Sequence, residues 1–238
     1  MAIKDMVKGI RTATKEEWLS ARRKLLEKEK ELTRKMDAVS AMRRELPWVP
    51  VEKKYVFESR TGLVELADLF QGRSQLVVYH FMLAPGWEEG CTGCSFICDH
   101  VDGARQPFEN HDLNFVAVSR ATWPEIERFR RRMGWTFDWV SSTDSDFNFD
   151  YGVSFRRDDL DKGPVLFNFQ NQTLKSEEQF GISIFAKDSD GVVHHTWSGY
   201  ERAGDILIGA HNWLDLTPRG RDEKSTMDWV RLHDKYGK

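Results

Sequence analysis

The segment from Leu76 to Gly103 reads LVVYHFMLAPGWEEGCTGCSFICDHVDG and decides the fold. Its first part, residues 76–82, is a nearly continuous run of β-branched, aromatic and other apolar side chains, which is typical of a strand covered on both faces. Residues 84–86, Ala-Pro-Gly, end that strand, and residues 95–97, Ser-Phe-Ile, continue as a helical pattern. The segment therefore predicts a central strand, a short loop and a helix whose first turn carries two cysteines.

The two cysteines, Cys91 and Cys94, are separated by two residues at the predicted helix start. The unpaired N–H groups and the positive dipole end of a helix N-terminus favour a thiolate, which is the nucleophilic form of cysteine. Two intervening residues also suit reversible disulfide closure. We predict a redox-active dithiol in which Cys91, at the exposed start, attacks, and Cys94, one turn inward, resolves.

A third cysteine and two carboxylates adjoin this pair. Cys98 continues the same helix face and is interpreted as a buried packing thiol. Glu88 and Glu89 immediately precede Cys91, and because nearby negative charge disfavours a thiolate, they predict a moderate thiol pKa. One of them exchanging a proton with Cys94 is an alternative to their being solvated loop residues.

Other side chains near the pair carry two interpretations each. Trp87 either lines the dithiol cleft or anchors the loop. Arg120, which follows the next predicted strand, either favours the thiolate and binds an anion or forms a salt bridge. His80 is better explained as a buried, hydrogen-bonded histidine than as a site residue, and His194 and His195 point in opposite directions along a strand.

Composition limits the class of protein. The 238 residues are 40% hydrophobic, which suffices for one sizeable domain plus an appendage. The net charge of −3 includes both signs in abundance, so neither nucleic acid nor a membrane surface is expected as a partner. Three cysteines within eight positions cannot form a disulfide framework, and no signal sequence or membrane-spanning run is visible. We expect a cytoplasmic protein without a cofactor.

The N-terminal region predicts one long helix. After a loosely structured start at residues 1–13, Thr14-Lys15-Glu16-Glu17 matches a capping box, and Pro47 ends the helical pattern. Apolar residues recur every seven positions, at Trp18, Leu25, Leu32 and Val39. We predict an extension over residues 1–48 that either packs in a homodimer or covers its own domain.

The remaining elements predict a mixed α/β domain over residues 49–218. Strands are expected at 49–57, 63–66, 113–119, 137–140, 182–186 and 192–197, and helices at 123–132 and 204–216. Residues 102–112 and 141–150 are expected to be turns and loop, and Arg130 to Arg132 a solvated helix end. Residues 219–238 are expected to form a docked tail with a short helix. This order fits a mixed sheet with helices on both faces.

These residues resemble the thioredoxin-like superfamily over about residues 50–217. The resemblance is closest to an uncharacterised bacterial branch of predicted dithiol-disulfide oxidoreductases, whose Trp-Glu-Glu-Gly-Cys-x-x-Cys-Ser-Phe signature matches residues 87–96 throughout. Residues 115–121, 132–135 and 146–150 are also similar to segments of that family. The resemblance implies a three-layer α/β/α sandwich with a mixed central sheet and a dithiol site at Cys91 and Cys94.

Residues 116–153, ending in Tyr151-Gly152-Val153, are similar to the peroxiredoxin pattern, but the peroxidase motif is missing. Peroxiredoxins place a proline seven residues and a threonine or serine three residues before the attacking cysteine, where this chain has Ala84 and Glu88. The usual thioredoxin prolines, before the strand facing the dithiol and before the second cysteine, are also absent. The missing peroxidase motif argues against peroxide reduction, whereas the missing prolines imply that a different backbone arrangement faces Cys91 and leave the redox potential unpredicted.

Thiol-disulfide exchange is the favoured hypothesis, with a disulfide-containing protein or small molecule as substrate and a cellular thiol reductant as second partner. The alternatives are a peroxiredoxin-like peroxidase, a non-catalytic interaction protein, and zinc binding through Cys91, Cys94, Cys98 and His100. A structural zinc site commonly draws its four ligands from two separated pairs, whereas this chain has one compact cluster.

Overall fold

The computed structural model describes residues 11–237, which belong to two units, one ending at Pro47 and one beginning at Trp48. The first unit contains helix α2 (Lys15–Arg44). The predicted capping box at its start is confirmed, because the Glu17 N–H donates to the Thr14 hydroxyl at 3.2 Å and the Thr14 N–H donates to the Glu17 carboxylate at 2.9 Å. Residues 1–10 of the predicted extension lie outside the described residues.

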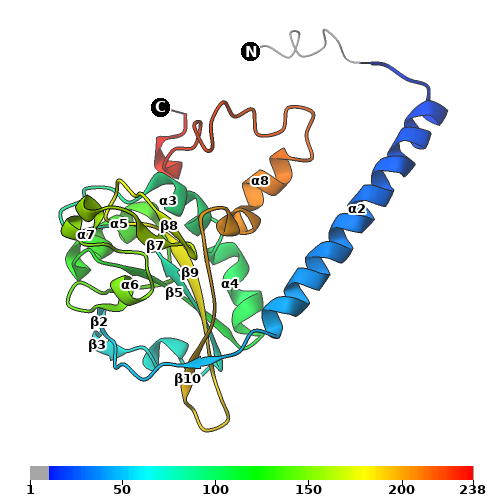
Figure 1. Ribbon diagram of the computed structural model, residues 1–238. Helices are drawn as coiled ribbons and strands as arrows, with labels where there is room; N and C mark the ends of the chain where they lie inside the picture. Colours follow the sequence, from blue (N-terminus) through cyan, green and yellow to red (C-terminus); the bar gives the residue numbers. More distant parts are fainter. Residues whose placement is uncertain (1–10, 238) are drawn as a thin grey trace. The chain divides into compact units, whose positions relative to one another are not determined.

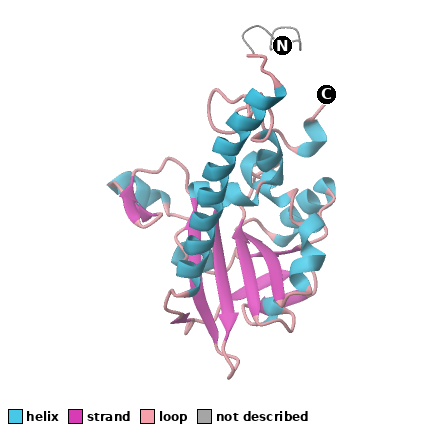
Figure 2. Ribbon diagram, turned by 90° about the vertical axis from the view of Figure 1, so that its right-hand side faces the viewer, coloured by secondary structure: helices cyan, strands magenta, loops and turns pink. Residues whose placement is uncertain are grey.

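The second unit is built on a mixed sheet (Figure 2), whose strands lie in the order β1-β10-β9-β4-β5-β6-β2-β3. Strands β4, β5 and β6 are parallel, and the other neighbouring pairs are antiparallel. The central position predicted for residues 76–82 is confirmed, since β4 lies between β5 and β9. The strands are β1 (Val49–Pro50), β2 (Val56–Ser59), β3 (Gly62–Glu65), β4 (Gln75–His80), β5 (Leu113–Ser119), β6 (Asp138–Ser141), β9 (Gly181–Lys187) and β10 (Val193–Tyr200), with β7 (Val165–Phe167) and β8 (Gln170–Gln172) forming a separate hairpin.

Helices connect and cover these strands (Figure 1). The α-helices of this unit are α3 (Thr92–Cys98), α4 (Asp102–Glu109), α5 (Trp123–Met133), α6 (Phe147–Asp150), α7 (Arg157–Lys162) and α8 (Gly209–Leu214). Short 3-10 helices are η1 (Asp68–Phe70), η2 (Glu201–Leu207) and η3 (His233–Lys235). None of the described helices combines the length and the apolar character that crossing a membrane requires.

Two apolar cores lie on opposite faces of the sheet because side chains alternate along each strand. On β4, Leu76 and Val78 belong to a cluster that includes residues of η1 and α6. Tyr79 and the following Phe81 belong to the other cluster, which includes residues of α3 and α5. The parallel strands joined through α3 and α5, followed by the antiparallel β9–β10 hairpin, form the predicted thioredoxin-like three-layer α/β/α sandwich.

The single strand predicted at residues 49–57 is wrong. Residues 49–50 form β1, which pairs with β10, whereas residues 56–59 form β2, which pairs with β6 and β3 in another part of the sheet. The polar residues 52–54 separate the two. Lys53 forms ion pairs with Asp150 at 2.6 Å and with Asp146 at 3.1 Å. This segment therefore makes polar contacts and lacks the apolar face of a strand that continues through a sheet.

Several short elements also differ from the prediction. Residues 102–109 form α4, although Gly103 and Pro107 made them look like a turn. The helix predicted at residues 204–216 is two helices, because Ile208 is extended between η2 and α8. Elements α6, α7, β7 and β8 went unpredicted, since three to six residues are too few to show a periodicity.

Candidate functional site

The loop between β4 and α3 is held by close packing. A Cβ on Gly90 would lie 2.4 Å from the Phe81 ring, so only glycine lets the chain approach that ring. The next residue, Cys91, donates its N–H to the Met82 carbonyl at 3.0 Å. Before them, the Gly86 N–H donates to Glu125 of α5 at 2.8 Å. These contacts fix Cys91 at the start of α3.

Cys91 is the N-cap residue of α3, and its sulfur accepts the N–H of Cys94 at 3.5 Å. The Ser95 hydroxyl and the Ser95 N–H each donate to the Cys91 carbonyl at 2.9 Å, which secures the first turn. The Cys91 side chain is half-buried, whereas Cys94 is only 1% exposed. The pair is thus arranged with one sulfur toward the surface and the other beneath it.

The two thiols have opposite acidities. The pKa of Cys91 falls from its ordinary value of 9.0 to about 6, mainly because the Cys94 thiol donates to it. Hydrogen bonds from the N–H groups of Cys94 and Gly93 lower it further and, with the thiol, outweigh burial, which raises it. Burial and the neighbouring Cys91 sulfur raise the pKa of Cys94. Near neutral pH, Cys91 is therefore mainly a thiolate and Cys94 a thiol.

Tyr79 lies under this pair and was not predicted as a site residue. Its side chain is 1% exposed, and its hydroxyl has no well-formed hydrogen bond to any described residue. The hydroxyl is nevertheless close enough to the Cys94 sulfur to lower the pKa of that thiol, while burial, and then the cysteines, raise the pKa of Tyr79. The sequence did not reveal that the Tyr79 hydroxyl lies near the Cys94 sulfur, because Tyr79 belongs to an apolar strand pattern that looks like core.

Glu89 does not face the thiolate as a free charge. Its carboxylate pairs with Lys235 at 2.8 Å and with Arg132 at 2.7 Å, and hydrogen bonds from these two side chains lower its pKa. Its charge is thus neutralised by pairing, and neither Glu88 nor Glu89 is among the groups that set the pKa of Cys91. Glu88 is exposed. The prediction of a solvated helix end is wrong for Arg132, which also pairs with Asp234 at 2.8 Å.

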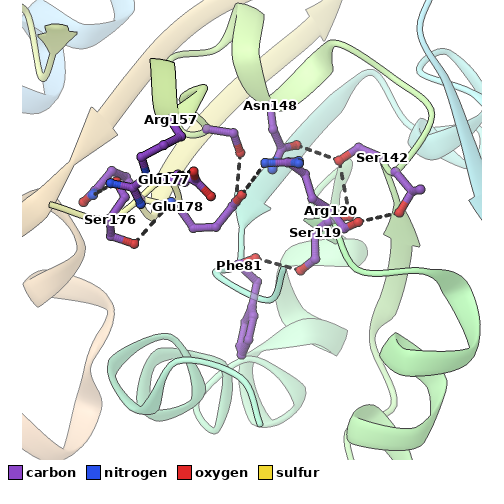
Figure 3. A network of polar contacts seen from close by, with 12 residues as sticks. Phe81, Ser119, Arg120, Ser142, Asn148, Arg157, Ser176, Glu177 and Glu178 are labelled. Carbon is purple, nitrogen blue, oxygen red and sulfur yellow. Dashed lines mark hydrogen bonds and ion pairs between the residues drawn. The ribbon is translucent and has the colours of Figure 1, made fainter. Parts of the chain in front are cut away.

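Arg120 forms a salt bridge, the second of its two interpretations (Figure 3). Its guanidinium lies 2.7 Å from Glu178, a carboxylate that is 3% exposed and also accepts from the Ser154 hydroxyl at 2.8 Å. Burial raises the pKa of Glu178 even though Arg120 opposes that shift. Arg120 is not among the groups that set the pKa of Cys91.

The other predicted neighbours are packed or hydrogen-bonded. Cys98 is fully buried, and burial raises its pKa. Trp87 packs, partly buried, against the same apolar cluster as Cys91. Both ring nitrogens of His100 are engaged, Nδ1 with the Phe96 carbonyl at 2.7 Å and Nε2 with the Ala210 N–H at 3.0 Å. Within residues 11–237, no group of three His, Cys, Asp or Glu side chains is placed to hold a metal ion.

The chain thus has a mixed α/β fold with a Cys-x-x-Cys pair between its central strand and a helix. A family model described as "Bacterial protein of unknown function (DUF899)" matches residues 7–236, and the chain belongs to this family. No curated protein matches the sequence.

The chain is also similar to several solved structures. A mutant of peroxiredoxin Q from Xanthomonas campestris has 12% identity and a TM-score of 0.45, over 66% of this chain and 90% of that one. Peroxidoxin BcpB from Mycobacterium tuberculosis has 13% identity and a TM-score of 0.45, over 69% and 93%. A putative thiol:disulfide interchange protein DsbE from Chlorobium tepidum has 16% identity and a TM-score of 0.40, over 69% and 97%.

Proposed function

We propose that the protein is a thiol-disulfide oxidoreductase in which Cys91 attacks a substrate disulfide and Cys94 resolves the product. The observation that carries the proposal is the asymmetry of the pair. Cys91 is half-buried, with its sulfur stabilised as a thiolate by the thiol and the N–H of Cys94, whereas Cys94 is a buried thiol directly behind it. Thiolate character and access are the two properties that make a cysteine reactive.

The exchange proceeds in two balanced steps. The Cys91 thiolate attacks one sulfur of a substrate disulfide, so a mixed disulfide forms and the other substrate sulfur leaves as a thiolate. Cys94 then loses its proton, which ends on one of the two released substrate sulfurs, and attacks the Cys91 sulfur; the second substrate thiolate leaves and a Cys91–Cys94 disulfide remains. The protein has given two electrons to the substrate, and a cellular thiol reductant returns them.

Tyr79 serves the second step in this proposal. Cys94 must become an anion in a buried place, where an unpaired charge is costly. The Tyr79 hydroxyl lies near that sulfur and, in the reduced protein, has no well-formed bond to any described group. It is therefore available to donate to the Cys94 thiolate as that charge appears, which lowers the barrier to resolution.

Under this proposal, several residues of the signature at positions 87–96 have distinct physical roles. Gly90 gives the loop room against Phe81, Cys91 and Cys94 carry the exchange, and Ser95 secures the helix turn through two hydrogen bonds to the Cys91 carbonyl.

A single-turnover experiment tests the proposal. The reduced full chain is mixed with bis(2-hydroxyethyl) disulfide and quenched with acid, and the products are identified by mass. The wild type should lose two hydrogens as the Cys91–Cys94 disulfide forms. Cys94→Ser should instead stop at a mixed disulfide on Cys91, while the matched control Cys98→Ser should behave as the wild type. Equal accumulation of adducts on all three cysteines, with no internal disulfide, would refute the proposal.

A further inference from the structure

The C-terminal segment, residues 222–236, passes beside α3 and places Met227 next to the dithiol (Figure 1). A Cβ added to Gly93 would lie 3.3 Å from the Met227 sulfur and 3.9 Å from the Cys91 sulfur, so the two sulfurs are within about 7 Å of each other. Both side chains pack, partly buried, against the same apolar cluster. Met227 is therefore a neighbour of the reactive sulfur although it is 136 positions away in the sequence.

The backbone at Met227 is held in an unusual conformation. Its φ is +60°, in the left-handed region that residues other than glycine, asparagine and aspartate rarely occupy. The Met227 N–H donates to the Glu223 carboxylate at 3.0 Å, and the Met227 carbonyl accepts the Val230 N–H at 3.1 Å. A long side chain thus stands where glycine would fit without strain, which points to a use for that side chain.

The part of the C-terminal segment that follows Met227 is attached to the rest of the domain by polar contacts and by buried apolar side chains. The polar contacts are Arg132 with Asp234 at 2.8 Å, Lys235 with Glu89 at 2.8 Å and His233 with Asp99 at 2.6 Å. Partly exposed pairs of this kind contribute little individually. Val230 and Leu232, each 3% exposed, join the apolar cluster that contains Cys94, and their burial supplies most of the attachment.

The surroundings of Cys91 are partly closed, since Cys91 itself is half-buried and the Met227 sulfur lies within about 7 Å of its sulfur. Trp87, Met82, Met227 and Cys91 all pack, partly buried, against the same apolar cluster. A substrate must bring a sulfur against Cys91 and still leave room for the departing thiol, because exchange depends on access to the attacked sulfur. A slender disulfide meets this condition more easily than one carried by a folded protein.

We propose that Met227 is a specificity-determining residue that confines Cys91 to small-molecule disulfides, and that the anchored C-terminal segment holds it there. This inference rests on the proposed exchange at Cys91 and adds the class of substrate. It also assigns a purpose to the Arg132 and Lys235 contacts on Glu89, which keep the segment beside the loop that carries the cysteines.

The test compares kcat/KM for bis(2-hydroxyethyl) disulfide with kcat/KM for insulin. Met227→Gly removes the side chain and suits the positive φ, whereas Met227→Leu keeps the volume and is its matched control. Arg132→Ala loosens the segment, and Arg131→Ala removes a neighbouring arginine that pairs only with Glu127 among the described residues. Melting temperatures verify that each variant is folded.

The wild type should prefer the small disulfide by about tenfold or more. Met227→Gly should raise kcat/KM for insulin about threefold to tenfold, and Arg132→Ala should raise it by a smaller factor, because the buried Val230 and Leu232 still attach the segment. Both should change the value for the small disulfide by less than about twofold. Met227→Leu and Arg131→Ala should keep the wild-type preference. Equal wild-type rates on both substrates, or an unchanged preference in Met227→Gly, would overturn the role of Met227 and leave the exchange proposal intact. A wild type that reduces neither substrate would instead overturn both.

Discussion

Tyr79 and His80 are consecutive residues of the central strand, and they bury polar side chains on opposite faces of the sheet. Tyr79 lies in the cluster beneath the dithiol, whereas His80 stacks on Phe147 and Tyr151 on the other face. Both side chains are at most 1% exposed. They differ in what their polar atoms contact.

His80 belongs to a hydrogen-bonded chain that crosses three strands. Its Nε2 is 2.8 Å from the Ser183 hydroxyl, that hydroxyl is 2.9 Å from the Ser198 hydroxyl, and the Ser198 hydroxyl is 2.8 Å from His195 Nε2. Two hydroxyl protons cannot serve three bonds, so one histidine must donate. We assign the donor as His80 Nε2, since this leaves only a lone pair on its Nδ1, which has no partner among the described residues.

The two residues therefore show how a buried polar group can be either structural or functional. Burial, with a smaller contribution from His195, lowers the pKa of His80 to about 3, so it stays a neutral member of a closed chain. Tyr79 instead keeps a donor without a well-formed bond to any described residue, beside a thiol that must ionise. We expect chemistry only on the Tyr79 face, and the following predictions test that difference.

The largest effect should come from the sulfur itself. Cys91→Ser should lower the rate of disulfide reduction about 1,000-fold or more, since a hydroxyl is not ionised near neutral pH and cannot form the mixed disulfide. Initial rates with bis(2-hydroxyethyl) disulfide measure the loss. Cys98→Ser is the control and should keep a rate within about twofold of the wild type. A Cys91→Ser protein that retained half the activity would place the nucleophile elsewhere.

The pH dependence should follow the ionisation of Cys91. Because the thiolate is the reactive form, alkylation by iodoacetamide should rise about tenfold per pH unit up to pH 6 and level off above it. Replacing the donor thiol by Cys94→Ala should move this midpoint upward by about one unit or more, toward the ordinary value. Mass spectrometry of timed samples gives the rate at Cys91 alone. A wild-type midpoint above pH 8 would contradict the stabilised thiolate.

The sequence predicted this site where its signals were local. The apolar run before Cys91, the breaking residues 84–86 and the two-residue spacing to Cys94 all lie within one strand, loop and helix, so neighbouring residues determine them. The central strand and the half-buried Cys91 over a buried Cys94 followed from these features alone.

The parts that could not be predicted depend on contacts distant in sequence. Arg132 looked like a solvated helix end because its partners, Glu89 and Asp234, are 43 and 102 positions away. Met227 sits in a charged stretch with no periodic pattern, so nothing local connects it with Gly93. Tyr79 looked like core, since aromatic residues are common in strands and only the fold shows which face meets the cysteines.

A smaller effect should come from removing the Tyr79 hydroxyl. Tyr79→Phe should slow the second step about thirtyfold, because a hydrogen bond to a charged group contributes about 2 kcal/mol. Quenched single turnovers should show the mixed disulfide on Cys91 forming at the wild-type rate and persisting longer. The melting temperature should be unchanged or higher, since the lost hydroxyl has no well-formed bond among the described residues. Equal lifetimes of the mixed disulfide in both proteins would make Tyr79 a packing residue.

The smallest effect on activity should come from the opposite face. Ser183→Ala removes the hydroxyl that joins His80 to Ser198 and leaves the His80 N–H buried without a partner. The free energy of unfolding should fall by about 1–3 kcal/mol, which urea denaturation measures. Disulfide reduction should stay within about twofold of the wild type, since the hydrogen-bonded side chains of His80, Ser183, Ser198 and His195 lie away from the dithiol, on the other face of the sheet. A Ser183→Ala protein with normal stability and a tenfold slower second step would show that both faces of β4 take part in the chemistry, and that a closed hydrogen-bonded chain is no sign of a purely structural role.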